Sequence, residues 1–414
     1  MSSQRPPRVL AIIPAIIPST IMLIIRPFQR LHARGVIETH ILPEVLVGKR
    51  ILDWADLVIF PRCISPSLLK WANYLDSQGV PWMYDLDDNF FDVPADTAFG
   101  KYVRRPEPQQ TLRRLIRGAR QVRVYARPLY EQVREYNPHV VQVSPPLDWA
   151  HILPRRSSPG DTVKIVYATS RTRDDELGKI FLPALRKIFT DFPRVELYFL
   201  GSNPLSDLVD ERIHFERFTR NYEEYLERFS SAGYDIGLAP LLDDLFHRSK
   251  TNVKFREYGA SRIAGVYSNV SVYSDWVTHG HNGLLVENTT QDWYQAIASL
   301  IEDTALRQQI QQQAFADVHE HFSEEQFDET WLQMIHQVLE MPREEQSPGP
   351  SPSTPPAAGD WGSLSRLARV RQKIADHDLT PADVSYFVRH YASSVWHFLH
   401  FEYALRQGRK KGGA

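Results

Sequence analysis

Residues 249–268, SKTNVKFREYGASRIAGVYS, decide the predicted fold. They are typical of a polar turn, then a helix, then a short buried strand. Lys250, Asn252, Lys254 and Glu257 lie around the predicted helix start. Backbone N–H groups at a helix N-terminus, flanked by lysines, suit a phosphorylated ligand. The plainer interpretation is a solvated helix start with an ion pair between Lys254 and Glu257, which share one helix face.

Glu257 has a second interpretation, as a ligand-binding residue. A carboxylate one turn into a helix can accept hydrogen bonds from two vicinal hydroxyls, as the acidic residue of a nucleotide-binding βαβ unit does with a ribose. The segment after the helix favours a ligand. An apolar run at 264–267 precedes SNVSVYSDWV, the turn HGHNG, the strand LLVE and a helix that begins near Gln291.

The pieces KTNVKFREYGA, GVYS, HNGLLVEN and DWYQAIASL, in this order and spacing, resemble the C-terminal half of glycosyltransferase group 1. These are the retaining GT-B enzymes of family 4 and its relatives. The resemblance extends to about Glu340. It implies an α/β fold in which two Rossmann-like, doubly wound domains face a central cleft. It also implies a UDP-, GDP- or similar nucleotide-sugar donor, retention of anomeric configuration, and no metal or other cofactor.

The resemblance assigns the donor-binding residues to the second domain. The first predicted strand of this domain is 163–168. In the resembling family the loop after this strand faces the donor diphosphate, and here that loop carries Arg171 and Arg173. Those arginines have an alternative role in ion pairs with the acidic residues at 174–176. The expected donor-binding residues, cations for the diphosphate and a glutamate for the ribose, are Arg171, Arg173, Lys250, Asn252, Lys254 and Glu257.

One position departs from the family pattern. Many members carry two glutamates separated by seven residues, and Glu257 matches the second of them. The first falls on Ser249, which can neither act as an acid nor stabilise a charge. We expect the neighbouring Lys250 to take over the electrostatic role, which makes it a candidate catalytic residue. The match is to a subgroup with a Lys-Ser/Thr-Asn turn.

Residues 81–94, PWMYDLDDNFFDVP, predict a strand that delivers Asp85, Asp87 and Asp88 to its carboxyl end. Three interpretations compete. The aspartates could form the metal-binding DxD motif of the other glycosyltransferase fold, GT-A, or an Asx-type turn with solvated acids. GT-B relatives place a YD-x-DD segment at the cleft wall, which favours the third. On that resemblance Asp87 and Asp88 are candidate catalytic residues, and Asp85 and Asp87 lie on the acceptor side.

The first βα unit adds one candidate residue. Residues 8–13 predict a buried strand, and the loop PAIIPST leads to a helix through Arg34 with Ser19 or Thr20 as N-cap. Arg26 on this helix is a candidate for the acceptor side or a member of a surface ion pair. The loop has no glycine, unlike the first loop of many relatives.

Residues 101–134 form a basic stretch. Helical spacing would bring Arg113, Arg117 and Arg120 together on one face. Such a run is usually a solvated helix surface. The sharper hypothesis is attraction to an anionic membrane leaflet or to a lipid-diphosphate acceptor.

Composition limits the class of protein. The 414 residues are 43% apolar, and a net charge of −2 argues against a general nucleic-acid binder. The single cysteine, Cys63, excludes an intrachain disulfide and a cysteine-based zinc site. The apolar run at 9–25 is split by prolines and lacks a cleavage site, so we expect a cytoplasmic protein, with peripheral membrane contact as an option.

Four regions are predicted along the chain. SEEQ at 323–326 predicts a capping box before a helix with an apolar stripe. EEQSPGPSPSTPPAAGD is a Pro/Ser linker, and beyond it lies an aromatic helix with a basic tail. The regions are an acceptor-side domain at 1–155, a donor domain at 156–341, the linker at 342–362 and a helical extension at 363–414.

Sequence reasoning thus predicts a glycosyltransferase that moves a sugar from a nucleotide sugar to a glycan or lipid-linked acceptor in surface-polysaccharide synthesis. One alternative is a catalytically inactive GT-B-like scaffold, which the serine at position 249 favours. The other is a metal-dependent transferase that uses Asp85 and Asp87.

Overall fold

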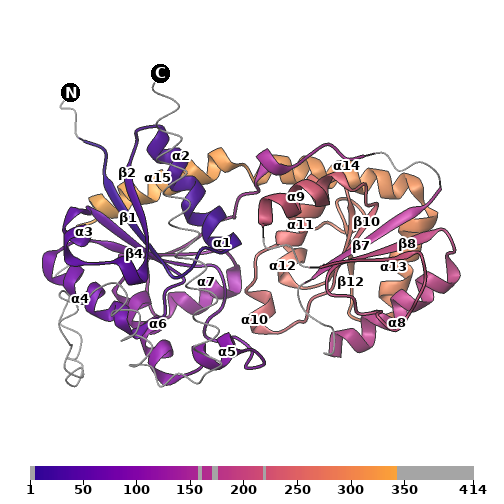
Figure 1. The fold of residues 1–414 in the computed structure, drawn as a ribbon, viewed down its shortest axis with the longest axis horizontal. Helices are drawn as coiled ribbons and strands as arrows, with labels where there is room; N and C mark the ends of the chain where they lie inside the picture. Colours follow the sequence, from indigo (N-terminus) through magenta and orange to yellow (C-terminus); the bar gives the residue numbers. More distant parts are fainter. Residues whose placement is uncertain (1–4, 157–160, 170–175, 218–220, 343–414) are drawn as a thin grey trace. The chain divides into compact units, whose positions relative to one another are not determined.

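The computed structural model describes residues 5–156, 161–169, 176–217 and 221–342. It divides into two compact units (Figure 1). Among the described residues, the first unit contains 5–124, Leu129–Val143 and 328–342, and the second contains Tyr125–Pro128 and those within Ser144–Phe327. In its described part each unit holds a six-stranded sheet, and its paired strands are parallel. The prediction of an α/β fold of GT-B type with two Rossmann-like units is confirmed.

The sheet of the first unit has the strand order β2-β1-β3-β4-β5-β6. β1, β3 and β4 are almost entirely buried apolar runs, as expected for parallel strands covered on both faces. The strands are β1 (Arg8–Ile13), β2 (Glu38–Pro43), β3 (Leu57–Pro61), β4 (Trp82–Leu86), β5 (Gln121–Val124) and β6 (Val140–Gln142).

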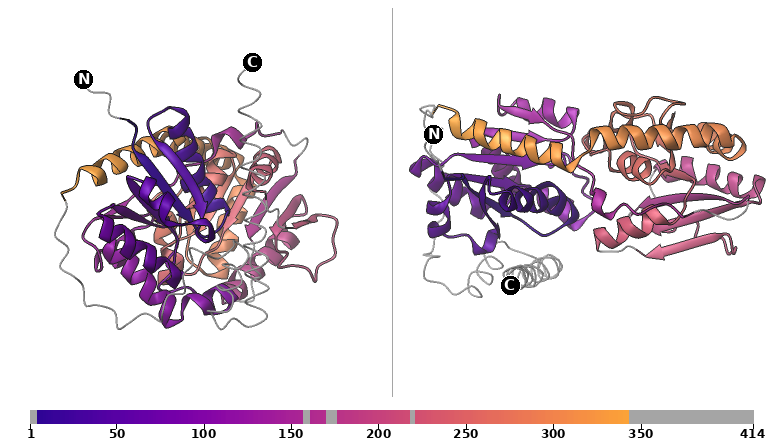
Figure 2. Two further views of the ribbon diagram at one scale, coloured as in Figure 1. Left: turned by 60° about the vertical axis from the view of Figure 1, so that its left-hand side comes forward. Right: turned by 90° about the horizontal axis from the view of Figure 1, so that it is seen from above.

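Helices cover both faces of this sheet (Figures 1 and 2). Phe28 of α2 meets Trp331 of α15 edge-on, at 5.0 Å between ring centroids, while α4 packs against α6. The helices that carry this layer are α1 (Pro18–Thr20), η1 (Ile21–Ile25, a π-helix), α2 (Arg26–Ala33), α3 (Lys49–Trp54), α4 (Leu69–Gln78), α5 (Ala98–Val103), α6 (Pro106–Gly118), α7 (Arg127–Arg134) and α15 (Glu324–Glu340). Short 3-10 turns of this unit lie at Glu44–Leu46 and Pro66–Leu68, and a third, Trp149–His151, belongs to the second unit.

The first helix begins earlier than the sequence predicted. Ile17 is its N-cap and Pro18 its first residue, so the prediction of Ser19 or Thr20 as N-cap is wrong. Proline is favoured at a first helical position because its missing N–H would have no partner there. Thr20 still serves the helix start: its hydroxyl accepts from the Ile17 amide at 2.9 Å and donates to the Ala15 carbonyl at 2.8 Å.

Helix α15 carries the chain from the second unit into the first. The Ser323 hydroxyl accepts from the Gln326 amide at 3.2 Å, as its predicted capping role requires. The apolar stripe of Phe327, Trp331, Ile335 and Val338 is buried, which confirms that it is core packing. On the same helix the buried Asp328 pairs with Arg30 of α2 at 2.7 Å.

The second unit has the strand order β12-β11-β10-β7-β8-β9. Numbered from its first strand, this is 6-5-4-1-2-3, the order of the dinucleotide-binding Rossmann sheet. The strands are β7 (Val163–Thr169), β8 (Val195–Gly201), β9 (Ile213–Arg217), β10 (Ile236–Ala239), β11 (Ala264–Ser268) and β12 (Leu284–Val286).

Two apolar cores hold helices on opposite faces of this second sheet (Figures 1 and 2). Trp293 of α13 meets Phe181 of α8 edge-on in one core, and Phe255 of α11 packs with the other. Gly259 permits the close approach of α14 to α11, since a Cβ there would lie 2.7 Å from the Ala314 carbonyl. The helices are α8 (Glu176–Asp191), α9 (Tyr222–Ser231), α10 (Leu245–Arg248), α11 (Val253–Ala260), α12 (Ser271–Ser274), α13 (Thr290–Glu302) and α14 (Thr304–His321).

The basic stretch at 101–134 is not one helix. It contains the second half of α5 and all of α6, β5 and α7. Arg113 and Arg117 of α6 lie over the rings of Phe91 and Tyr136, at 5.6 and 5.3 Å. Arg120 lies beyond the end of α6 and donates to the Met341 carbonyl at 2.8 Å. The prediction of one shared arginine face is therefore wrong for Arg120, because the chain turns into β5 after Gly118.

The predicted linker, apart from its first residue, and the predicted extension at 363–414 lie outside the described residues. Among the helices in the described ranges, none combines the length and apolar character that crossing a bilayer demands.

Candidate functional site

The strand order of each sheet contains one switch point, where consecutive connections leave two neighbouring strands in opposite directions. Ligands of doubly wound sheets bind beyond the carboxyl ends of the strands at such a point. In the second unit the switch point lies between β7 and β10, and in the first unit between β1 and β3. The loops after these four strands are therefore the candidate binding segments.

Of the two loops in the second unit, the one after β10 is fully described. Arg171 and Arg173 belong to the loop after β7 and lie outside the described residues, so their roles stay predictions. At the start of the loop after β10, the Leu241 amide donates to the Ser268 hydroxyl at 2.8 Å, and Ser268 donates to Asn288 at 2.7 Å. These bonds anchor the loop to the end of the neighbouring strand β11.

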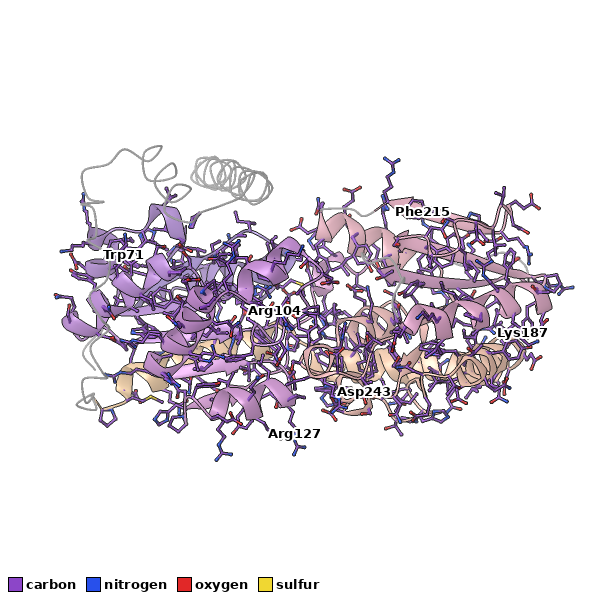
Figure 3. All side chains as sticks on the ribbon, turned by 90° about the horizontal axis from the view of Figure 1, so that it is seen from below. Trp71, Arg104, Arg127, Lys187, Phe215 and Asp243 are labelled. Carbon is purple, nitrogen blue, oxygen red and sulfur yellow. The ribbon has the colours of Figure 1, made fainter. Side chains whose placement is uncertain are left out.

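A short capped helix, α10, shapes this loop. The Asp244 carboxylate accepts from the His247 amide at 2.9 Å and pairs with its imidazole Nδ1 at 2.7 Å. Partial burial acts to raise the pKa of Asp244, but these bonds outweigh it and the pKa lies below its usual value. The exposed Asp243, labelled in Figure 3, forms an ion pair with Arg248. Both carboxylates thus fix the backbone that leads to Lys250.

Lys250 follows α10 directly. Its amide donates to the His247 carbonyl at 3.2 Å, and its ammonium nitrogen lies 4.2 Å from the centre of the Phe246 ring. Ser249, at the position of the family's first glutamate, is fully buried and donates to the Leu245 carbonyl at 2.7 Å. The serine therefore completes the turn, and the charged side chain of this turn is that of Lys250.

Asn252 is the N-cap of α11 and makes an unusual set of bonds for that position. No side-chain capping bond forms; instead its Oδ1 accepts from Arg256 Nε at 3.1 Å. Its Nδ2 is buried and has no hydrogen-bond partner among the described residues. Burying an amide N–H without a partner is unfavourable by about 1–3 kcal/mol, so this donor is suited to an incoming acceptor.

Glu257 lies on the same helix with its carboxylate held by three donors. Tyr222 donates to Oε1 at 3.2 Å, and Tyr225 and Lys254 donate to Oε2 at 3.1 and 2.7 Å. The ion pair that the sequence predicted between Lys254 and Glu257 is thus formed. Direct contact of Lys254 with a diphosphate stays a prediction. Only 2% of Glu257 is exposed.

In the first unit, Arg62 lies at the switch point, directly after β3. Its φ of 55° is in the left-handed region, which is unfavourable for a residue with a Cβ. The Arg62 amide donates to the Asp85 carbonyl at 2.8 Å, which helps to hold this conformation. Sequence reasoning did not select Arg62, although a charged residue after a buried strand is a usable signal.

The Arg62 guanidinium joins two of the predicted aspartates. It forms an ion pair with Asp87 and lies 3.3 Å from Asp88. Burial raises the pKa of Asp87, and the charges of Asp88 and Asp85 add to this while Arg62 opposes it. Asp87 is 6% exposed, whereas the Asp88 side chain is half-buried. Asp87 therefore combines a fixed position with an enhanced affinity for a proton.

Asp85 points into the core instead. Its carboxylate accepts from Arg123 Nε of β5 at 2.7 Å, and both side chains are fully buried. The Arg123 guanidinium also lies 3.4 Å from the centre of the Trp331 ring and donates to the Leu23 carbonyl at 3.3 Å. This arrangement favours a role for Asp85 in holding β4, β5, η1 and α15 together. Its acceptor-side role stays a prediction.

Two further predictions concern metal and Arg26. In the described ranges no group of three or more His, Cys, Asp and Glu side chains is placed to hold a metal ion. Asp85 and Asp87 each pair with an arginine, unlike a DxD pair with oxygens directed at a cation. Arg26 is the first residue of α2, where the π-helix η1 ends, and its acceptor-side role stays a prediction.

Residues 163–303, from the start of β7 to just beyond the end of α13, match the family model described as glycosyl transferases group 1. Residues 163–303 carry a group 1 glycosyltransferase domain. The family predicted from the sequence and the class of enzyme are both confirmed. No curated protein matches the chain.

Solved structures resemble this chain over most of its length. Sucrose-phosphate synthase from Thermosynechococcus elongatus superposes with a TM-score of 0.61 and 15% identity, over 81% of this chain and 99% of that one. HepE from Anabaena, solved with UDP and glucose, superposes with a TM-score of 0.56 and 13% identity, over 80% of this chain and 100% of HepE. A glycosyltransferase from Rickettsia africae superposes with a TM-score of 0.55 and 12% identity, over 82% of this chain and 100% of that one. At such identities the likeness establishes the fold.

Proposed function

We propose that this glycosyltransferase moves a sugar from a nucleoside-diphosphate sugar to a hydroxyl of a saccharide or lipid-linked acceptor. One observation carries the proposal. Lys250, the buried unpaired amide of Asn252 and the N-terminus of α11 follow one another at the switch point of a Rossmann sheet, with Glu257 one turn further on. This set offers positive charge and N–H donors for a diphosphate, and a carboxylate for a ribose.

The donor diphosphate is assigned to Lys250, Asn252 Nδ2 and the first amides of α11. When the bond between the anomeric carbon and the diphosphate oxygen breaks, negative charge grows on that oxygen. Donors already held in place stabilise this charge more in the transition state than in the bound donor, which accelerates the step. The Phe246 ring beneath the ammonium and the capped turn of α10 hold Lys250 ready for this role.

Lys254 receives a different assignment from the one the sequence favoured. Its ammonium pairs with Glu257 at 2.7 Å, so we assign it to orienting that carboxylate. A carboxylate oriented in this way can accept hydrogen bonds from both hydroxyls of a ribose.

On the acceptor side we assign Asp87 to the attacking hydroxyl, held in place by Arg62. The acceptor oxygen bonds to the anomeric carbon as the bond from that carbon to the diphosphate oxygen breaks, and the Asp87 carboxylate accepts the hydroxyl proton. Retention of configuration and independence from metal belong to the proposal, as does a place in surface-polysaccharide synthesis. The anomeric form of the product by NMR and assays in EDTA test the first two.

Ligands of similar proteins support the choice of donor. HepE, which shares the fold, was solved with UDP and with UDP-glucose. Titration of full-length protein with UDP, GDP, ADP and dTDP, with Mn²⁺ and with EDTA, tests the proposal. Absence of binding would favour an inactive scaffold, and a strict metal requirement would favour the DxD enzyme. Turnover is then measured with oligosaccharide acceptors and with lipid-linked acceptors in anionic vesicles.

Glu257→Gln is expected to weaken binding of the preferred nucleoside diphosphate about tenfold or more. Hydrogen bonds to a charged acceptor contribute about 1.5–3 kcal/mol each, and the amide cannot accept from both hydroxyls while meeting Lys254. Calorimetric titration measures the affinity. The control is Glu224→Gln on exposed α9 surface, which should leave it unchanged. Equal affinity in both variants would remove Glu257 from the donor site.

Asp87→Asn is expected to lower transfer about 10²–10⁴-fold while sparing nucleoside diphosphate binding, since an amide cannot accept the hydroxyl proton. In the wild type, burial raises the pKa of Asp87, so transfer should fall on acidification at a pH above the usual titration range of an aspartate. The rate–pH profile of wild type and variant checks both expectations. Full turnover by the variant would exclude Asp87 from the mechanism.

A further inference from the structure

The carboxylate of Glu257 is occupied by protein donors in the described structure. Its oxygen Oε1 accepts from the Tyr222 hydroxyl at 3.2 Å, and Oε2 accepts from Tyr225 at 3.1 Å and from Lys254 at 2.7 Å. With 2% of the residue exposed, a ribose cannot reach these oxygens without movement of a neighbour. The binding role assigned to Glu257 therefore requires one of its partners to leave.

Tyr225 is fixed on several sides. Its hydroxyl accepts from Lys254 Nζ at 3.3 Å, and the ammonium lies 5.6 Å from the centre of its ring. The ring stacks on Phe229 at 5.3 Å, and Phe229 in turn stacks on Tyr258 of α11 at 5.9 Å. Moving Tyr225 would break this aromatic column and remove its hydroxyl from both Lys254 and Oε2.

Tyr222 occupies a more peripheral position. It is the first residue of α9, after the N-cap Asn221, whose side chain accepts from the amides of Glu223 and Glu224 at 3.1 and 3.4 Å. Its half-buried ring stacks on Tyr225 at the outer end of the column, at 5.9 Å and 27°. A change in side-chain torsion can carry its hydroxyl away from Glu257 while the capped helix start stays in place.

We propose that Tyr222 is a gate of the ribose site: its hydroxyl holds the place of a ribose hydroxyl on Oε1 and is exchanged for the nucleoside when the donor binds. This inference rests on the proposed function of Glu257. A carboxylate oxygen has two lone-pair positions, so an open Oε1 can accept from both vicinal hydroxyls of a ribose. Lys254 and Tyr225 keep Oε2 and hold the carboxylate in position throughout.

The exchange makes Tyr222 a determinant of nucleotide affinity. When a ribonucleotide binds, the hydrogen bond from Tyr222 to Oε1 is replaced by two, from the 2′ and 3′ hydroxyls. A 2′-deoxyribonucleotide replaces it by one, from the 3′ hydroxyl. The gate therefore lowers the affinity for both ligands and leaves 2′-deoxyribonucleotides without a compensating bond. A site with an open carboxylate would bind both more tightly.

The test is calorimetric titration of full-length wild type, Tyr222→Phe, Tyr222→Leu, Tyr225→Phe and Glu257→Gln with UDP, GDP and ADP and their 2′-deoxy counterparts. Removal of the competing hydroxyl should tighten binding of the preferred nucleotide about three- to tenfold in both Tyr222 variants. Its 2′-deoxy form should also bind more tightly. Tyr225→Phe is the matched control, which removes a hydroxyl that stays on Oε2 and should not tighten binding.

The outcomes separate this inference from the proposed function. Unchanged or weaker binding by both Tyr222 variants, with Glu257→Gln still impaired, would overturn the gate and leave the ribose site. Tightening by Tyr225→Phe equal to that by Tyr222→Phe would also overturn it. No binding of any nucleotide by any of these proteins, with their melting temperatures unchanged, would overturn both the gate and the proposed donor site.

Discussion

Replacing Lys250 by methionine is expected to lower kcat about 10²–10³-fold, with a smaller effect on nucleoside diphosphate affinity. Methionine is an unbranched side chain similar in length to lysine, and it removes the ammonium charge that lies over the Phe246 ring. The loss should fall on the transition state because negative charge on the departing diphosphate is greatest there. Steady-state kinetics combined with titration of the nucleotide separates the two effects.

The position of Lys250 makes this the most informative single change. Ser249 stands where many relatives have a glutamate and is buried within the turn, and the charged groups on either side of it are Arg248 and Lys250. Arg248→Met is the matched control: Arg248 lies two residues away, is exposed and pairs with Asp243. Its transfer rate should stay within a fewfold of wild type. Equal losses in both variants would indicate a general loss of positive charge and contradict the specific role of Lys250.

The second large effect concerns stability. Asp85→Asn is expected to destabilise the first unit by about 3–5 kcal/mol, because it leaves the charge of Arg123 buried without its carboxylate. Both side chains are fully buried, and Arg123 also contacts Trp331 of α15. Denaturant unfolding, followed by the fluorescence of Trp331 and the other tryptophans, together with hydrogen exchange in β4 and β5, measures the loss.

Two controls test the cause of this loss. Glu329→Gln removes the exposed ion pair with Arg34 in the same unit and should cost no more than about 1 kcal/mol. The double variant Asp85→Leu/Arg123→Met replaces the buried pair by apolar groups and should recover much of the stability. A loss in Asp85→Asn no larger than that in Glu329→Gln would show that the buried pair is unimportant.

The strands that sequence reasoning missed share a physical cause. β5 has the sequence QVRV, and its fully buried Arg123 masks the apolar pattern that marks a central strand. Arg123 is tolerated there because Asp85, 38 residues away in sequence, neutralises it. β2 and β9 are edge strands with partly exposed residues, so neither has a continuous apolar run. The residues within a strand therefore do not reveal that a charged side chain in it is buried when the residue that neutralises the charge is distant in sequence.

The candidate residues show the same division. Lys250, Asn252 and Glu257 were selected from a local turn-and-helix pattern, and the structure places them around the start of α11 as that pattern predicts. Arg62, Tyr222 and Tyr225 were missed, because each meets its aspartate or glutamate from a separate segment. Which of the three aspartates faces the core was likewise invisible, since Asp85, Asp87 and Asp88 differ only in their distant partners.

Through its resemblance to a known family, the sequence predicted the family and two Rossmann-like units, and its local patterns predicted the buried strand at 8–13 and the turn that carries Lys250. The local patterns depend on contacts within a few residues, where side-chain type and spacing decide the backbone conformation. Only the tertiary structure decided that Asp85 is a buried partner of Arg123, that Arg62 holds Asp87, and that tyrosines cover Glu257. The reason is that a charge or hydroxyl is characterised by what lies within about 3 Å of it. In a doubly wound sheet, those neighbours come from strands and helices far apart in the chain.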